Sequence, residues 1–148
     1  MIGPQFKMQI INDGEMPKLA HRGDAGFDLV ANESCVLKPM ERRAIGTGIR
    51  ISIPEDYVAL IHPRSGIALK EGISVINTPG TVDSGYRGEV KVALINLGDR
   101  VYEIVRGLRI AQLVIQKVET PEWKIVDELD ETDRGSGGFG STGGYKNA

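Results

Sequence analysis

Short apolar runs rich in β-branched residues recur along the chain, and glycine, proline, asparagine and aspartate separate them. The runs occupy residues 8–11, 26–30, 45–53, 57–61, 89–96, 102–105 and 109–118. Some alternate strictly, so that Val90, Val92 and Leu94 share one face while Lys91 and Ala93 share the other. Strand-sized runs with turn signals about every 8–12 residues are typical of all-β sandwiches and barrels. The pattern therefore predicts an all-β fold.

Helical periodicity is almost absent, with one turn expected at residues 65–70. The 19 glycines in a mainly β chain indicate many tight turns. A length of 148 residues suits one domain with a substantial core. We expect a single-domain β-barrel or jelly-roll over residues 1–126 and a flexible, glycine-rich C-terminal arm over residues 127–148.

The net charge of −2 provides no general field toward nucleic acid or an anionic membrane, so neither is expected as a partner. Cys35 is the only cysteine and cannot form an internal disulfide, which suits a reducing compartment; it is expected to be a small buried hydrophobe. No apolar stretch is long enough to span a membrane, and the N-terminus lacks a signal-peptide pattern. A cytoplasmic protein is expected.

Three loops combine charged, hydroxyl and glycine residues, and loops between strands are where a β fold usually carries its chemistry. They span residues 24–29 (DAGFDL), 62–66 (HPRSG) and 77–88 (NTPGTVDSGYRG). Backbone amides beside a guanidinium in the second loop predict a phosphate clamp. The third loop is expected to form a hairpin whose turn carries an aspartate and a tyrosine.

Each of these features also has a purely structural interpretation. Asp28 could cap a turn, Arg64 could form a surface ion pair, and Asp83 could form an Asx turn. A serine-hydrolase triad of His62, Ser65 and Asp83 is disfavoured because no GxSxG elbow surrounds the serine. Scattered histidines and one cysteine disfavour a structural zinc site. Near a phosphate clamp, Asp28 could instead serve a magnesium ion.

The chain ends in an unusual segment, residues 134–144 (RGSGGFGSTGG). Such glycine-rich ends are commonly flexible coil without a function. Gly135, Gly137 and Gly140 match the GxGxxG pattern of dinucleotide loops, but no helix follows, as that motif requires. Phe139 is the only bulky side chain within the segment, and its presence there calls for another explanation.

Five segments together resemble the five ordered motifs of the trimeric dUTPases. They are residues 24–29, 63–66, 80–90, 107–114 and 134–143. The resemblance implies a jelly-roll homotrimer with sites shared between subunits and Mg²⁺ as cofactor. It also implies a dUTP diphosphatase, which hydrolyses dUTP to dUMP and pyrophosphate, keeps uracil out of DNA and supplies dUMP for thymidylate synthesis. The alternative is a catalytically silent trimer that binds nucleotides or partners.

The resemblance also implies roles for individual residues. Asp83 matches the general base that activates water for attack on the α-phosphorus, and Gln112 matches a glutamine near that water. Tyr86 matches a ring packed on the deoxyribose that leaves no space for a 2′-hydroxyl, and Asp28 matches a carboxylate that reaches magnesium through water. The remaining implied substrate-binding residues are Arg64, Ser65, Gly66, Asn77, Gly80, Thr81, Val82, Lys91, Arg134, Phe139, Gly140 and Ser141.

The same resemblance implies a function for the C-terminal segment. The arm is expected to cross to a neighbouring subunit and close over its nucleotide, with Phe139 stacked on uracil and Arg134 on the γ-phosphate. Glycines suit this role because the backbone itself must approach the ligand. The related dCTP deaminases have a glutamate as acid/base where this chain has Ala93, so deamination is disfavoured.

Overall fold

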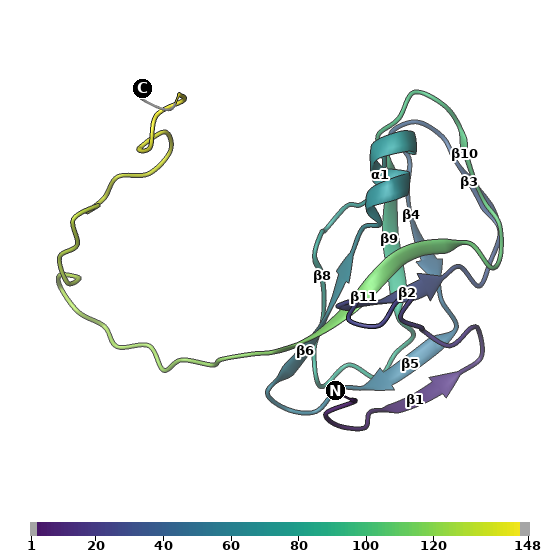
Figure 1. Cartoon of the computed structure of the whole chain (residues 1–148), viewed down its shortest axis with the longest axis horizontal. Helices are drawn as coiled ribbons and strands as arrows, with labels where there is room; N and C mark the ends of the chain where they lie inside the picture. The colour runs from purple at the N-terminus through teal and green to yellow at the C-terminus, as the bar shows by residue number, and fades with distance from the viewer. Residues whose placement is uncertain (1–2, 146–148) are drawn as a thin grey trace.

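The computed structural model describes residues 3–145, so the outermost residues of the predicted core and arm, 1–2 and 146–148, lie outside the described residues. Within that range the chain forms eleven strands and one helix (Figure 1). The strands are β1 (Gln9–Asn12), β2 (Gly26–Val30), β3 (Cys35–Leu37), β4 (Arg42–Gly46), β5 (Ile49–Ser52), β6 (Tyr57–His62), β7 (Ile73–Val75), β8 (Gly80–Val82), β9 (Lys91–Asn96), β10 (Tyr102–Ile104) and β11 (Arg109–Lys117). The helix is α1 (Ser65–Glu71).

The strands pair in four antiparallel sheets. The largest has the order β2-β11-β6-β8, a three-stranded sheet has the order β4-β9-β7, and two ribbons join β1 to β5 and β10 to β3. Side chains from all four sheets meet in one hydrophobic core. The all-β, single-domain prediction is confirmed, although no closed barrel of paired strands forms within residues 3–145.

The alternation predicted for residues 89–96 is confirmed as far as Leu94 in β9, beyond which Ile95 is buried as well. Val92 and Leu94 are fully buried, while Lys91 between the core positions is exposed. The final residue of β9, Asn96, is also fully buried, because its side-chain amide is satisfied by backbone partners. Its Nδ2 donates to the carbonyls of Leu37 and Arg100 at 3.0 and 2.8 Å. One polar side chain thereby ties three chain segments together.

Three sequence-based predictions are wrong in detail. The run 45–53 is not one strand, because a turn containing Gly48, at φ 74°, separates β4 from β5. Residues 77–88 do not form a hairpin, because β8 pairs with β6 while β9 pairs with β4 and β7. The segment that carries Asp83 therefore connects two different sheets. Cys35, expected to be buried, is only partly buried.

Helix α1 confirms the turn expected at residues 65–70. Arg64 precedes it with extended backbone, and Gly72 ends it in the left-handed region at φ 73°. The Gly72 amide donates to the carbonyl of Ala68, which closes the last helical turn. Within residues 3–145, no helix is long and apolar enough to cross a membrane.

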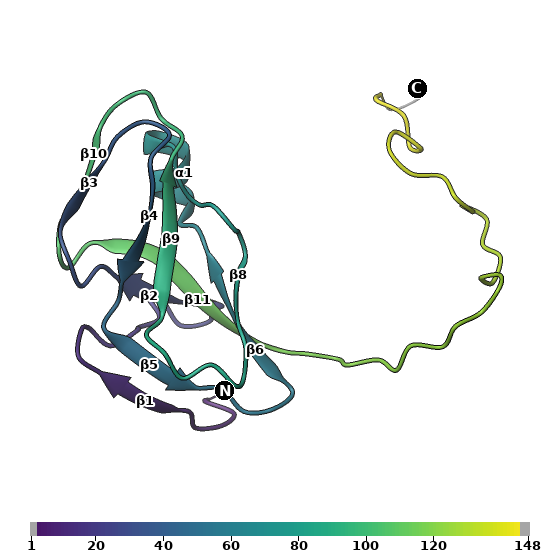
Figure 2. The same ribbon diagram turned by 180° about the vertical axis from the view of Figure 1, so that it is seen from behind.

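The C-terminal arm leaves the core after β11 and extends away from it in both views (Figures 1 and 2). Every residue from 119 to 145 is exposed, and none lies in a helix or strand. The hydrogen bonds described in this segment join arm residues to one another, such as Arg134 Nε to the carbonyl of Gly137 at 2.7 Å. The arm therefore gains nothing from packing on its own core.

Candidate active site

A pocket of about 210 Å³ lies where β8 leaves the four-stranded sheet for β9. It brings together seven of the residues predicted for the site: Asn77, Gly80, Thr81, Val82, Asp83, Tyr86 and Lys91. Buried Ile61, Val82 and Val90 contribute apolar wall, and Asp83 and Lys91 contribute opposite charges. A small concave site with a few converging polar groups on an apolar base suits a flat, polar ligand such as a nucleobase and its sugar.

The turn after β8 holds its own side chains in place. The Tyr86 amide donates to the Asp83 carbonyl at 3.1 Å, and the Tyr86 hydroxyl donates to the Glu89 carbonyl at 2.8 Å. Arg87 Nη1 donates to the carbonyls of Ser84 and Tyr86 at 2.5 and 3.1 Å. The carboxylate of Asp83 is left exposed at the pocket, where it can accept a proton from a bound water.

Asp28, Arg64 and Arg109 form a second polar group, on the four-stranded sheet. The two oxygens of Asp28 lie 3.7 Å from Arg64 Nε and 3.6 Å from Arg109 Nε. Arg64 Nη1 also donates to the Arg109 carbonyl at 3.1 Å. The Asp28 side chain is 17% exposed and the arginines 34% and 60%, so the guanidinium groups reach solvent beyond the carboxylate. Two such cations suit an anionic ligand like a phosphate.

Gln112 adjoins this group, because it lies directly opposite Asp28 in the pairing of β11 with β2. Its Nε2 donates to the Pro63 carbonyl at 3.0 Å, which links β11 to the loop that starts α1. A side chain at Gly26 would overlap the Gln112 amide, so the glycine leaves the space that this amide fills. Ser65 and Gly66 follow in the first turn of α1, where helical amides have no intrahelical partner and face outward.

The Asp28 group and the pocket wall at Ile61 lie on opposite faces of the four-stranded sheet. Directly opposed residues share a face and successive residues alternate. Asp28, Gln112 and His62 are directly opposed across β2, β11 and β6. Ile61, which precedes His62, is 4% exposed and lines the pocket that contains Asp83. The pocket lining includes none of Asp28, Arg64, Arg109 and Gln112, so the predicted site is divided into two groups within one chain.

The phosphate-clamp half also shows the one resolved electrostatic shift among residues 3–145. Burial raises the pKa of Tyr102 on β10, Glu71 raises it further, and Arg64 opposes the shift. The phenol therefore stays protonated at neutral pH. Arg64 therefore lies near enough to Tyr102 to lower the pKa of the phenol.

Among residues 3–145, no three His, Cys, Asp or Glu side chains gather to hold a metal ion. Asp28 is one carboxylate with a guanidinium near each oxygen. Mg²⁺ commonly takes one or two carboxylates and completes its shell with water and substrate phosphates. The residues therefore fit a magnesium ion held mainly by phosphate, and not a metal caged by the chain alone.

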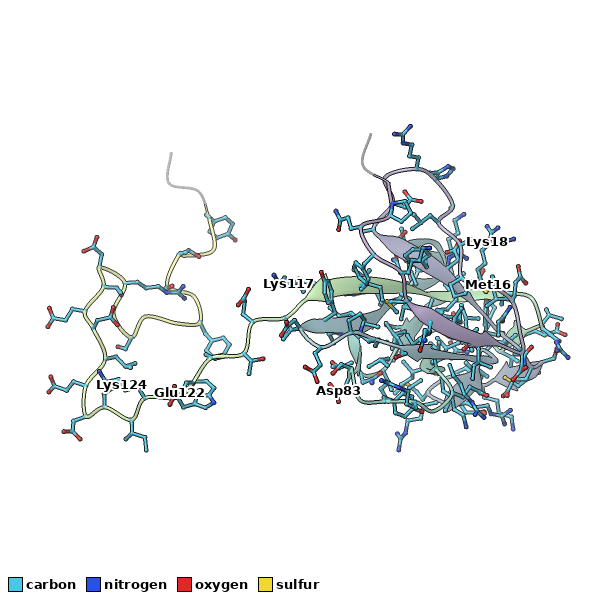
Figure 3. The ribbon with its side chains drawn as sticks, turned by 90° about the horizontal axis from the view of Figure 1, so that it is seen from below. Met16, Lys18, Asp83, Lys117, Glu122 and Lys124 are labelled. Carbon is cyan, nitrogen blue, oxygen red and sulfur yellow. The ribbon has the colours of Figure 1, made fainter. Side chains whose placement is uncertain are left out.

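The remaining predicted residues, Arg134, Phe139, Gly140 and Ser141, lie on the arm and line a shallow hollow within it. Phe139 is fully exposed. Figure 3 shows Glu122 and Lys124, in the segment that leads from β11 to the arm, well apart from the core that carries Asp83. The structure of one chain therefore does not bring the arm to either half of the site.

Comparisons with known proteins agree with this geometry. Residues 12–143 match the sequence model of the dUTPase family. The chain belongs to the dUTPase family. It is 57% identical over 131 residues to the deoxyuridine 5′-triphosphate nucleotidohydrolase of Nocardia farcinica, covering 88% of this chain and 79% of that one. The resemblance to dUTPases that the five sequence segments indicated is confirmed.

Two solved structures extend the comparison. The dUTPase of Staphylococcus bacteriophage 80alpha, determined with the dUTP analogue dUPNHPP, superposes with a TM-score of 0.86 at 33% identity, covering 93% of this chain and 98% of that one. A point mutant of the dUTPase from phage phi11 of S. aureus, described with a structural Mg(II) ion, gives a TM-score of 0.77 at 30% identity over 85% of this chain and 100% of that one. Both are dUTPases, so this family member shares their fold.

Sequence reasoning did not select Ile61, Glu89 or Val90, although all three line the pocket. Glu89 and Val90 lie inside the segment 80–90 that carried the resemblance, but side-chain chemistry alone did not distinguish them. Ile61 carried no signal, because it resembles any other buried strand residue. Arg109 lies in the fourth segment, and only its distance from Asp28 reveals its place in the site.

Proposed function

We propose that this protein is a dUTP diphosphatase, which hydrolyses dUTP to dUMP and pyrophosphate. The observation that carries the proposal is the pocket at the β8–β9 connection, which gathers a carboxylate, an aromatic ring, an amide and a lysine around exposed backbone. Relatives of more than 50% identity that are named deoxyuridine 5′-triphosphate nucleotidohydrolase support the same activity.

In the proposed reaction, Asp83 accepts a proton from water as the water oxygen bonds to the α-phosphorus. The bond from the α-phosphorus to the bridging oxygen then breaks, and pyrophosphate leaves with its electron pair. The exposed position of the aspartate carboxylate gives water access to it. Gln112 is proposed to act near that water from the other half of the site.

Recognition of the substrate divides between the two halves. Asn77 and the backbone of residues 80–82 are proposed to read the uracil edge, since cytosine would reverse one hydrogen-bond polarity. Tyr86 packs on deoxyribose, and Lys91 lies beside the substrate. Arg64, with the amides of Ser65 and Gly66, holds the triphosphate.

Asp28 is proposed to reach Mg²⁺ through water when the triphosphate is bound. The ion would neutralise charge on the phosphate oxygens. The ion pairs of Asp28 with Arg64 and Arg109 keep this carboxylate in one orientation beside the phosphates.

We further propose a homotrimer whose sites are shared between subunits. The separation of the two groups supports this assembly, because a second copy would place its Asp83 pocket beside the Asp28–Gln112 group. The arm (residues 127–148) is proposed to close over a neighbouring site, with Arg134, Phe139, Gly140 and Ser141 on the nucleotide. The unpaired Cys35 supports a reducing, cytoplasmic setting.

The activity is tested by pyrophosphate release from dUTP, dCTP, dTTP and UTP with Mg²⁺. We expect dUTP to exceed the others in kcat/KM by at least about 100-fold, because mismatched buried hydrogen bonds and a blocked 2′-hydroxyl both discriminate. Comparable turnover of dCTP or UTP would refute the assignment. Nucleotide binding without pyrophosphate release would favour the alternative of a silent, nucleotide-binding trimer.

The assembly is tested by mixing two inactive variants, Asp83→Asn and Arg64→Ala, after verified subunit exchange. Each variant alone damages every site, but a mixed trimer with shared sites contains some intact pairs of halves. We expect partial recovery of dUTP hydrolysis. If activity stays absent although mixed trimers are present, each site is built within one chain.

A further inference from the structure

Gly88 lies against the ring of Tyr86. A Cβ atom at position 88 would be 2.6 Å from the tyrosine Oη, 2.7 Å from Cζ and 3.0 Å from Cε2. Non-bonded carbon contacts are optimal at about 3.5–4.0 Å, so this atom cannot be accommodated without movement. The ring therefore occupies the space in which any other residue at position 88 would place its side chain.

The Tyr86 ring is positioned by local backbone and not by the core. It is 46% exposed, although it lines the pocket. Its hydroxyl donates to the Glu89 carbonyl, one residue beyond Gly88, at 2.8 Å. Its own carbonyl accepts a hydrogen bond from Arg87 Nη1 at 3.1 Å. The ring thus lies over Gly88, and its hydroxyl is hydrogen-bonded to the Glu89 carbonyl. This arrangement requires a residue without a Cβ atom at position 88.

We propose that Gly88 is a specificity-determining residue, which fixes the Tyr86 ring where it excludes a ribose 2′-hydroxyl. This inference rests on the proposed function and adds a residue to it. A Cβ at position 88 displaces the ring and not the backbone, because the overlapping atoms belong to the far end of an exposed side chain. The displaced ring loses its hydrogen bond to the Glu89 carbonyl. It also leaves the space that it occupied, so a ribose 2′-hydroxyl can enter.

The test compares Gly88→Ala with Gly85→Ala in the same turn. Neither glycine has a positive φ, so alanine is compatible with the backbone at both positions. A Cβ at Gly85 would meet nothing within 4 Å, which makes it a matched control. We measure kcat/KM for dUTP and UTP, and the affinities of dUMP and UMP by calorimetry, which report selectivity even where turnover is weak.

We expect Gly88→Ala to lower the dUTP:UTP and dUMP:UMP ratios by at least about tenfold, the range in which small steric changes discriminate ligands. Gly85→Ala should leave both ratios within about twofold of wild type. Thermal unfolding of both variants should match wild type, because the displaced ring is exposed. In a Tyr86→Ala background, Gly88→Ala should change the ratios no further, since the two substitutions act through one ring.

Unchanged ratios in Gly88→Ala overturn the inference, and so does an equal loss in Gly85→Ala, which would indicate a general effect of the turn. An additive loss in the Tyr86→Ala background overturns it as well. The wild-type assay separates this result from the parent proposal: if wild type does not release pyrophosphate from dUTP, the proposed function fails, whatever the glycine variants do.

Discussion

Phe139→Ala is the sharpest test of the C-terminal arm, because the ring is fully exposed in the single chain. Exposed side chains away from special features change stability by about 0.5 kcal/mol or less, so the free energy of unfolding should stay near wild type. If the ring stacks on uracil in the closed site, its loss removes about 1–3 kcal/mol of binding. That range corresponds to about 5–150-fold in kcat/KM for dUTP.

The assay is initial-rate pyrophosphate release from dUTP below KM, together with chemical unfolding of the same preparations. Tyr145→Ala provides the control, since Tyr145 is also an aromatic residue of the arm and is 94% exposed, but lies outside the segment 134–143. We expect the control to stay within about twofold of wild type. Equal kcat/KM for Phe139→Ala and wild type would refute the lid and leave the segment as a flexible end.

Three further predictions concern the core and the chemistry. Asp83→Asn keeps the shape of the side chain but removes the base, so kcat should fall by about 10²–10⁴-fold. The affinity for dUMP, measured by calorimetry, should stay near wild type, and a near-normal kcat would place the base elsewhere. Asn96→Ala leaves the carbonyls of Leu37 and Arg100 and the amide of Gly98 without their side-chain partner. The free energy of unfolding in urea should therefore fall by about 3–5 kcal/mol, and a fall below about 1 kcal/mol would contradict this role. Burial raises the pKa of Tyr102 above its ordinary 10.0, so stability is unaffected by this group below pH 10 and falls above it, where only the unfolded chain ionises readily. Tyr102→Phe should therefore reduce the loss of stability between about pH 9 and about pH 11, and an identical loss in both proteins would refute the shift.

Much of the fold could be predicted because its signals are local. Residues 26–30 and 109–117 contain enough apolar, aromatic and β-branched residues between turn signals to indicate strands by themselves. Strands β3 and β7, of three residues each, were missed, whereas β10, also of three residues, was found within the run 102–105; strands this short do not show a period reliably. The split of the run 45–53 depends on Gly48 adopting a positive φ, which glycine permits but does not require.

The site was predicted in its composition and not in its arrangement. Every pocket residue that carries polar chemistry except Glu89 was selected from the sequence, because the loop 77–88 combines charge, hydroxyl and glycine and because the family resemblance implied roles for the others, Lys91 among them. The supposed hairpin at 77–88 was wrong because local turn residues cannot indicate which strand a chain will pair with next. That choice depends on which neighbours bury the apolar faces of β8 and β9.

The sequence by itself determined the all-β class, the membership of the dUTPase family and the residue types of the site, since periodicity and motif order are properties of the chain alone. Only the tertiary structure decided that Asp28, Arg64 and Arg109 meet, and that the pocket containing Asp83 does not include them. Side chains alternate faces in a strand, so one residue of register decides on which side of a sheet a group acts. Register is fixed by long-range pairing, and so the division of the site into two halves emerges only in the folded chain.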